Sequence, residues 1–447
     1  MSIALFSVGG SGIWLFSRIS SQAVRMWCAV AAMLARALLA GTVATLTLAL
    51  GDALAGETIE IAFIEPLSGP FALQGQERLT IFRAAAEEIN LAGNLLGGGR
   101  FEIVPYDRKG KTQDAINQQK QAIDHDVRYI AASVSSAVNA ISDALVKHNA
   151  RNPNHSILLL DFNALDPALT ESKCNFWHFR FEAHADTQVN ILTEYMARQP
   201  SIRKVYLINQ DYSYGQAVSR AANAMLRAKR GDIQIVGDDL VPLNKVKDFS
   251  PYVAKIRASD ADSVLTGNWG SDLSLLIKAS NEAGLRANYY TLLSFLPGTA
   301  TSIGAAGAER ILTLASWHMN AADAIWEKKL LAFKQKYQTV SNLDYLPAFR
   351  VMEMLTKAMN KAGTTDPAKV AYVLEGMRYM GPSGESWMRT EDHQMIVPIY
   401  IARLAKAGQT GVKHDAEGTG YGWKTEAVFE AKDMIPVLKC QMERPPS

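Results

Sequence analysis

The chain has 447 residues, of which 48% are hydrophobic and 20% are charged, a balance that is ordinary for a globular protein. Its 46 basic and 44 acidic side chains give a formal net charge of +2, and the two signs are mixed along the chain. This length is too great for one ordinary domain, and there is no basic stripe with interleaved aromatic residues. We therefore expect two domains and no nucleic-acid partner.

The N-terminal residues 1–55 differ from the rest of the chain, because they contain almost no acidic side chain. Arg36 precedes an apolar run over 37–50, which leads into a small-x-small sequence that ends at Ala55. This order is typical of a secretory signal peptide. A membrane anchor is the alternative interpretation, since it needs a run of ~20 apolar residues. The small-residue site and the strand pattern that starts at Ile59 favour cleavage after Ala55, and hence a periplasmic protein.

The three cysteines agree with export. Cys28 falls inside the predicted leader and lacks the small apolar residues that precede a lipidated cysteine. Cys174 and Cys440 remain in the exported chain. An isolated pair in an oxidising compartment can form a disulfide. We favour a Cys174–Cys440 bridge over the alternative of two buried thiols.

The mature chain begins with an alternation of short β-branched runs and amphipathic stretches, which predicts parallel sheets covered by helices. The first series has strands at 59–64, 101–106, 129–133 and 157–160 and helices at 76–89, 112–123 and 137–148.

A second series of the same kind follows. Its strands are predicted at 204–209, 233–238, 263–266 and 289–293, and its helices at 185–198, 215–229, 250–257 and 271–283. Two long helical stretches at 321–338 and 345–362 and a strand at 395–403 complete the chain. The sequence therefore predicts an α/β protein with two doubly wound parallel sheets in tandem. A ligand crevice is expected beyond the carboxyl ends of the strands.

Short runs along the chain, in a consistent order, are similar to the branched-chain amino-acid-type solute receptors of ABC transporters. These runs are Glu65–Pro70, Ala86–Asn90, Tyr106–Asp107, Ser135–Ser136, Asp166–Thr170, Phe179–Arg180, Asp211–Gly215, Asp248–Ser250 and Gly381–Pro382.

The resemblance implies a type I periplasmic-binding fold whose two lobes are joined by a hinge with three crossings, near 180–183, 314–318 and 384–388. It also implies a monomer without a cofactor, which closes around a small molecule and delivers it to an inner-membrane ABC permease. After the signal peptide, the expected parts are 56–181 and 317–385 in lobe 1 and 182–316 and 386–447, with the C-terminal tail, in lobe 2.

The resemblance also points to ligand-binding residues in lobe 1. The family binds a substrate carboxylate after the third strand, where this chain has Ser135 and Ser136 at the start of a helix. Free N–H groups at a helix start favour an anion, although a serine there also commonly caps the helix. After the fourth strand, Asp161, Asn163 and Ala164 match the family's second contact, and Leu165 stands where the family has a hydroxyl.

In lobe 2 the matching residues are aromatic. Tyr214 and Trp269 lie in loops after strands, which favours contact with a ligand over a purely structural role. Amino-acid-binding members carry a carboxylate near 293–298, but this chain has Ser294 and Phe295 there and no acid. A buried ammonium without a partner is costly. Unless Asp161 replaces that carboxylate rather than capping its own loop, we expect an aromatic or aliphatic carboxylate, or an alcohol-derived compound, without an α-amine.

Two roles are compatible with these features: a transport receptor, or a non-transport accessory protein of a periplasmic quinoprotein alcohol-oxidation system. An enzyme is not indicated, because the sequence has no Gly-x-Ser-x-Gly elbow and no His-Glu-x-x-His zinc motif. His318 and Met319, with His393 and Met395, are too far apart in the sequence to indicate a copper site. We expect no catalytic residue and no metal.

Overall fold

The computed structural model describes residues 56–321, 323–339 and 345–445. The predicted signal peptide lies outside these residues, so the account that follows concerns the chain from Glu57 onward. Within the described part, no helix has the length and apolar character needed to cross a bilayer.

Lobe 1 is built on sheet A, whose five strands are all parallel and follow the order β2-β1-β3-β4-β5. Strands β3 and β4 are buried along their whole length, which explains their continuous apolar sequences. The strands are β1 (Thr58–Glu65), β2 (Arg100–Asp107), β3 (Tyr129–Ala132), β4 (Leu158–Asp161) and β5 (His178–Arg180).

Helices cover both faces of sheet A, because alternate side chains of β1 point to opposite sides. Ile61 and Phe63 pack in the core that includes α2 and α11, whereas Ala62 and Ile64 pack in the core formed with α3 and α4. The helices are α2 (Ala72–Ala92), α3 (Thr112–Asp124), α4 (Ser135–Arg151), α11 (Tyr345–Ala362) and α12 (Pro367–Leu374).

Lobe 2 is built on sheet B, with the order β15-β14-β10-β9-β8-β6-β7. Five of its strands are parallel to one another. Strand β14 pairs antiparallel with β10, and β15 pairs antiparallel with β14. The strands are β6 (Lys204–Gln210), β7 (Gln234–Val241), β8 (Ser263–Thr266), β9 (Asn288–Thr291), β10 (Ile311–Ala315), β14 (Ile399–Lys406) and β15 (Tyr421–Phe429).

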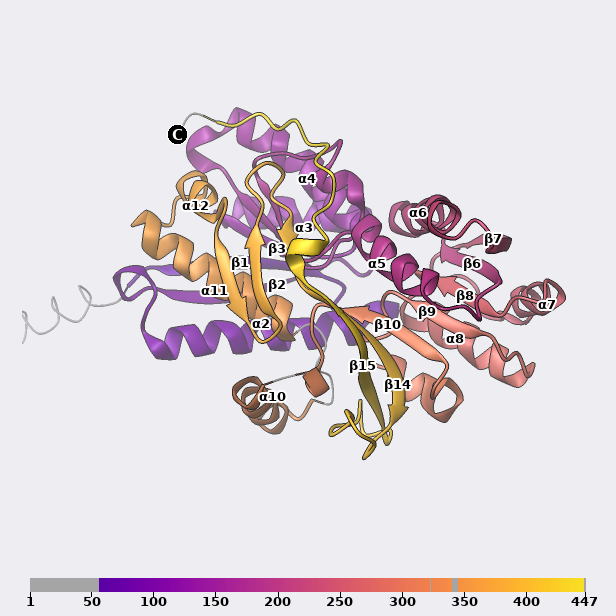
Figure 1. Ribbon diagram of the computed structural model, residues 1–447. Coiled ribbons are helices and arrows are strands. Elements are labelled where there is room, and N and C mark those ends of the chain that lie inside the picture. The colour runs from indigo at the N-terminus through magenta and orange to yellow at the C-terminus, as the bar shows by residue number, and fades with distance from the viewer. Residues whose placement is uncertain (1–55, 322, 340–344, 446–447) are drawn as a thin grey trace, which may run out of the picture. The chain divides into compact units, whose positions relative to one another are not determined.

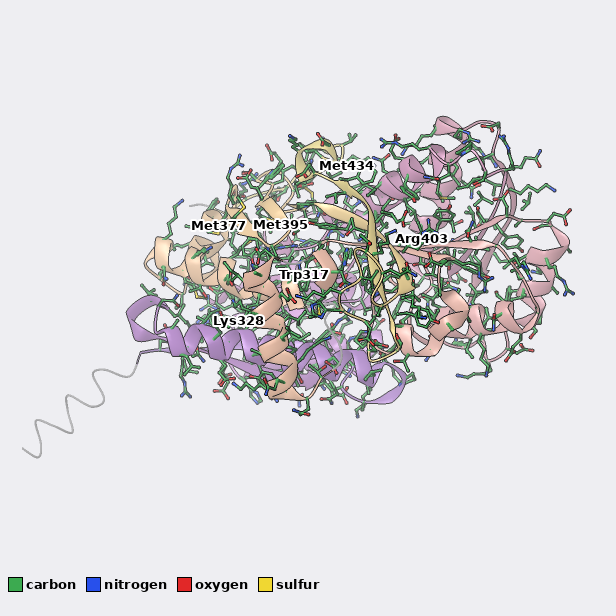
Figure 2. All side chains as sticks on the ribbon, turned by 60° about the horizontal axis from the view of Figure 1, so that its bottom comes forward. Trp317, Lys328, Met377, Met395, Arg403 and Met434 are labelled. Carbon is green, nitrogen blue, oxygen red and sulfur yellow. A yellow bond between two sulfur atoms is a disulfide. The ribbon has the colours of Figure 1, made fainter. Side chains whose placement is uncertain are left out.

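Sheet B is also covered on both faces. Leu207 packs in the core with α5 and α6, and its neighbour Ile208 packs in the core with α7 and α8. The helices are α5 (Ala185–Ala197), α6 (Ser213–Lys229), α7 (Ser250–Ala258) and α8 (Gly270–Glu282). The two sheets confirm the predicted fold class of two doubly wound α/β lobes. Figure 2 shows side chains occupying the space between the helices and the sheets.

The structure differs from the sequence prediction where the chain enters lobe 2 for the last time. Instead of one strand over 395–403, β13 (Met395–Ile396) ends before Pro398, which has no N–H to donate to a ladder, and β14 starts at Ile399. The third crossing was predicted near 384–388, but those residues form β12 (Gly384–Met388), which pairs with β11 (Arg378–Gly381) and β13 in a small sheet C. The passage to sheet B therefore falls at 397–398.

The C-terminal tail leaves sheet B and returns to lobe 1 (Figure 1). Cys174 and Cys440 form a disulfide, with 5.7 Å between their Cα atoms. Lys439 adds an ion pair with Glu171 at 2.9 Å. The tail is thus a fourth connection between the lobes, in addition to the three passages after β5, β10 and β13.

Candidate ligand-binding cleft

The carboxyl ends of the strands in sheets A and B face each other, and side chains connect the two edges. Phe71, just after β1, packs on Trp269, just after β8, with ring centroids 4.8 Å apart. Gln74 in α2 donates from Nε2 to the carbonyl of Pro297 at 3.3 Å. This is the place where doubly wound folds bind ligands.

Two cavities lie between these edges, and they share Asn163 and Leu293. The first, which we call the tyrosine cavity, has a volume of about 20 Å³ and is lined by Arg78, Val134, Ser135, Asn163, Leu165, Tyr212, Tyr214, Trp269, Leu293 and Leu296. The second, the glutamate cavity, has a volume of about 40 Å³ and is lined by Asn163, Glu182, Gln188, Leu292, Leu293, Phe295, Leu314, Ala315, Ser316, Trp317, Pro347 and Ile399.

The start of α4 presents hydrogen-bond donors to the tyrosine cavity. Val134 precedes the helix with φ +68°, a region that β-branched residues rarely adopt, and no side chain caps this helix end. Ser135 Oγ accepts hydrogen bonds from the N–H groups of Leu165 and Asp166, each at 3.1 Å, so its own proton remains available for another acceptor. Ser136, which was also predicted, lines neither cavity.

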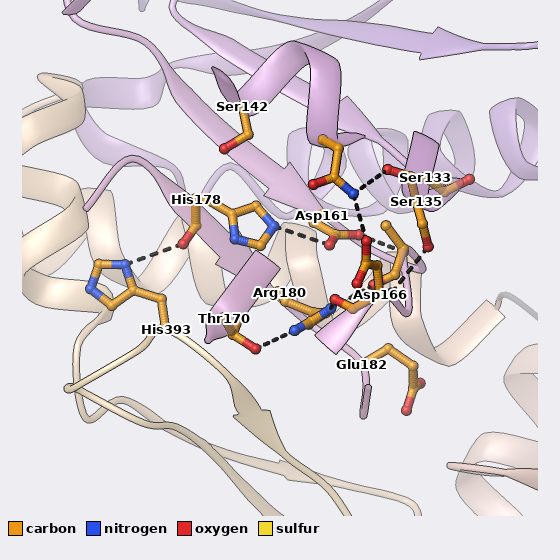
Figure 3. A network of polar contacts seen from close by, with 12 residues as sticks. Ser133, Ser135, Ser142, Asp161, Asp166, Thr170, His178, Arg180, Glu182 and His393 are labelled. Carbon is orange, nitrogen blue, oxygen red and sulfur yellow. Dashed lines mark hydrogen bonds and ion pairs between the residues drawn. The ribbon is translucent and has the colours of Figure 1, made fainter. Parts of the chain in front are cut away.

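The predicted loop after β4 contributes one lining residue. Asn163 lines both cavities, while Asp161 and Ala164 line neither. The buried Asp161 carboxylate accepts from the N–H of Ala164 at 2.6 Å and contacts His178 Nε2 at 3.0 Å (Figure 3). These contacts fit the alternative in which Asp161 caps its own loop.

Arg180 holds this loop through hydrogen bonds, and Figure 3 shows it beside Asp166 and Thr170. Its fully buried guanidinium donates to the carbonyls of Ala164 at 3.1 Å and Asp166 at 2.6 Å, and its Nε donates to Gln394 Oε1 at 2.8 Å. It also contacts the Thr170 hydroxyl. Gln394 comes just before β13. The Arg180 side chain therefore joins the loop after β4 to the segment that leads into lobe 2.

Three aromatic residues of lobe 2, Tyr212, Tyr214 and Trp269, line the tyrosine cavity. The Tyr214 hydroxyl is buried and has no hydrogen-bond partner among the described residues. Burial raises the pKa of Tyr214 well above its ordinary value, so the hydroxyl stays protonated and can donate. Trp269 donates from Nε1 to the Tyr212 hydroxyl at 2.8 Å. A Cβ on Gly215 would lie 1.9 Å from the carbonyl of Gln210, which explains why glycine follows Tyr214.

Phe295 lines the glutamate cavity, where its ring packs against Trp423 with centroids 4.6 Å apart. Ser294 is buried and lines neither cavity, and its N–H donates to Thr313 Oγ1 at 3.3 Å. The loop at 293–298 therefore places no carboxylate in the cleft, as its sequence indicates.

The sequence analysis missed a carboxylate that the cleft does contain. Glu182, in the segment after β5, lines the glutamate cavity, and its Oε2 accepts from Ser316 Oγ at 2.7 Å. Arg350 Nη1 lies 3.9 Å from the same oxygen. The cleft therefore contains an acid outside the loop at 293–298. The available signal was an acidic residue within the predicted first crossing at 180–183.

Arg78 in the tyrosine cavity was also missed. Its Nη1 donates to Ser133 Oγ at 2.9 Å and lies 3.6 Å from Glu65 Oε2. Glu65, at the end of β1, accepts from the N–H of Ser133 at 2.6 Å. The signal was a cation on the apolar face of the predicted helix 76–89, next to Leu79 and one turn before Phe82.

Comparison with known proteins agrees with this architecture. The family model described as "Periplasmic binding protein" matches residues 58–409. The chain is 33% identical over 416 residues, which are 90% of this chain and 97% of the relative, to "Leu/Ile/Val-binding protein homolog 4" of Brucella melitensis.

Among solved structures, the leucine-, isoleucine-, valine-, threonine- and alanine-binding protein of Brucella ovis, in a closed conformation, has a TM-score of 0.79 and 30% identity, and covers 87% of this chain and 100% of its own. An ABC-transporter solute-binding protein of Rhodopseudomonas palustris HaA2, in complex with p-hydroxybenzoic acid, has a TM-score of 0.72 and 21% identity, and covers 84% and 98%. At that identity the second similarity concerns the fold alone.

Proposed function

The chain belongs to the periplasmic binding protein family, and on this premise we propose that it is the receptor of an ABC importer for a small organic carboxylate without an α-amine. The family is one of solute receptors rather than of enzymes, and it implies the periplasm and a permease partner. In the proposal, the monomeric receptor closes around its ligand and docks transiently on the inner-membrane permease.

The observation that carries this proposal is the convergence of donors on the tyrosine cavity. The unpartnered hydroxyl of Tyr214 comes from lobe 2, and the Ser135 hydroxyl at the uncapped start of α4 comes from lobe 1. Arg78 adds a guanidinium, whose charge suits the same ligand group. Donors and a helix N-terminus together favour an anion with several acceptor oxygens, such as a carboxylate.

The absence of an α-amine is inferred from the position of the charges. An α-ammonium is attached next to the carboxylate, so it would occupy the tyrosine cavity. The only charged side chain that lines this cavity, among the described residues, is the cation Arg78. Glu182 lines the other cavity, and Asp161 is committed to its own loop. An ammonium beside Arg78 would be repelled and poorly compensated.

Closure of the lobes is supported by the contacts that span the cleft. The pairs Phe71–Trp269 and Gln74–Pro297 each join lobe 1 to lobe 2. They require the two edges to approach each other, and both cavities are small because the edges are close. In our proposal the ligand stabilises this arrangement, since it contacts both lobes at once.

A binding screen tests the proposal. Purified mature protein is screened by thermal shift against benzoates, short aliphatic carboxylates, alcohols and the amino acids leucine, valine and alanine, and the hits are measured by calorimetry. We expect a carboxylate without an α-amine to bind most tightly. A leucine affinity that exceeds that of every such carboxylate would overturn the proposal.

Two variants test whether the ligand that the screen identifies binds in the cleft. Tyr214→Phe removes one donor to a charged group, which corresponds to roughly a tenfold weaker affinity, and Trp269→Ala should abolish detectable binding. Tyr252→Phe, in α7 of lobe 2, is the matched control and should bind as the wild type does. Equal affinities for the Tyr214 and Tyr252 variants would exclude the tyrosine cavity as the carboxylate site.

A further inference from the structure

The glutamate cavity differs in chemistry from the tyrosine cavity, and the two share the lining residues Asn163 and Leu293. We propose that it binds a hydroxyl group at the far end of the ligand, so that the substrate class is a carboxylate with a distal hydroxyl. This inference rests on the proposed function, because it takes the carboxylate to lie in the tyrosine cavity.

The first support is a buried acceptor without a donor. Gln188 lines the glutamate cavity and is 6% exposed, and its Oε1 has no hydrogen-bond partner among the described residues. Its Nε2 donates to the carbonyl of Ala183 at 2.9 Å, which fixes the orientation of the amide. A buried carbonyl oxygen without a donor is costly. A ligand group with an O–H or N–H would remove that cost.

The second support is the carboxylate of Glu182, which lines the same cavity. Its Oε1 accepts from the N–H of Ala183 at 2.9 Å, and its Oε2 accepts from Ser316 Oγ. A carboxylate accepts hydrogen bonds and donates none. With Gln188, it makes this cavity rich in acceptors.

A neutral hydroxyl fits this cavity better than an ammonium. The charge of Glu182 is already balanced by Arg350, which is fully buried and lies 3.9 Å away. An ammonium would add a second buried cation near the same carboxylate, and burying a charge that is not compensated is costly. A hydroxyl donates a proton to either acceptor without adding charge.

The rest of the cavity wall suits an apolar ligand body between the two polar ends. Leu293, which both cavities share, and Phe295 and Leu314 in the glutamate cavity present apolar surface. Glu182 follows β5 of sheet A and Ser316 follows β10 of sheet B, so the hydroxyl site is assembled from both lobes.

Calorimetry with matched acids tests this inference. The probes are 4-hydroxybenzoate against benzoate and 6-hydroxyhexanoate against hexanoate, with 4-(aminomethyl)benzoate as the cationic analogue. We expect the hydroxy acid of at least one pair to bind about tenfold or more tightly than its deoxy partner, and the cationic acid to bind more weakly than the hydroxy acid. Equal affinities within both pairs would overturn the inference and leave the proposed carboxylate receptor intact. Failure of all five acids to bind would overturn both.

Substitutions then test whether the preference for the hydroxy acid arises in the glutamate cavity. Gln188→Met removes the acceptor at similar volume, and Glu182→Gln removes the charge, and each should reduce the ratio between hydroxy and deoxy acid affinities towards one. Gln119→Met is the matched control, because Gln119 is a buried glutamine with an unpartnered Oε1 between α3 and α4, away from the cleft. A ratio that changes equally in the Gln119 and Gln188 variants, or in neither the Gln188 nor the Glu182 variant, would overturn the assignment.

Discussion

Replacement of Phe71 by alanine tests whether closure of the lobes controls affinity. Phe71 lines neither cavity, so the substitution removes no ligand contact. Its ring packs on Trp269 across the cleft, with centroids 4.8 Å apart and an interplanar angle of 35°. Both rings are buried in this contact. The main effect of Phe71→Ala should therefore be on the equilibrium between open and closed arrangements.

The magnitude follows from the lost contact. An aromatic pair contributes roughly 0.5–1.5 kcal/mol beyond its area, and the apolar area that the ring covers on Trp269 adds to this. A total of about 1–2 kcal/mol lowers the ratio of closed to open protein about 5- to 30-fold. If the ligand binds only the closed arrangement and the free protein is mostly open, the apparent Kd rises by the same factor.

Calorimetry with the tightest ligand of the screen measures this Kd, and small-angle scattering of ligand-free protein reports whether the variant is more open. Tyr252→Ala is the matched control, since it removes a ring pair with Phe249, at 5.7 Å, within lobe 2. It should lower the melting temperature without changing Kd. An unchanged Kd in Phe71→Ala, with the ligand-free dimensions also unchanged, would refute the reasoning that this contact helps to hold the lobes together.

Three further predictions concern stability. The disulfide between Cys174 and Cys440 spans 266 residues, so its removal by serine substitution should lower the free energy of unfolding by up to about 5–6 kcal/mol on the loop-entropy estimate, and a denaturant midpoint equal to that of the wild type would contradict this. Burial lowers the pKa of His318 from 6.5 to about 4. As the pH falls from 6.5 towards 4, the unfolded chain takes up a proton that the folded protein does not, and stability falls by about 1.4 kcal/mol per pH unit. Urea melts at pH 7 and pH 5 should show about 2 kcal/mol less acid destabilisation in His318→Gln than in the wild type, whereas equal losses would exclude His318 as a cause. Arg180→Met removes a buried guanidinium that donates to four acceptors and leaves the Ala164 carbonyl without a donor among the described residues, at roughly 1–3 kcal/mol, so its melting temperature should fall by several degrees; an unchanged melting temperature would refute the inferred role of the guanidinium.

The sequence by itself determined most of the two strand–helix series, but it did not predict β5, β10, β15 or the strands β11 and β12 of sheet C. The apolar runs at 129–133 and 157–160 predicted β3 and β4 because parallel strands are buried on both faces. The position of Tyr214 and Trp269 after strands placed them at the cleft, since the carboxyl ends of parallel strands share one edge. The break at Pro398 was equally available in the sequence, because proline cannot donate to a ladder.

The pairing of distant segments was decided only by the tertiary structure. Glu182 and Gln188 carry no periodic signal that would direct them into a cavity, and they face it because the passage after β5 lies beside the passage after β10. Arg78 is buried because the end of β1 supplies Glu65 beside it. Local periodicity specifies which face of an element is covered, but it does not specify which partner covers it. The chemistry of the cleft depends on those partners.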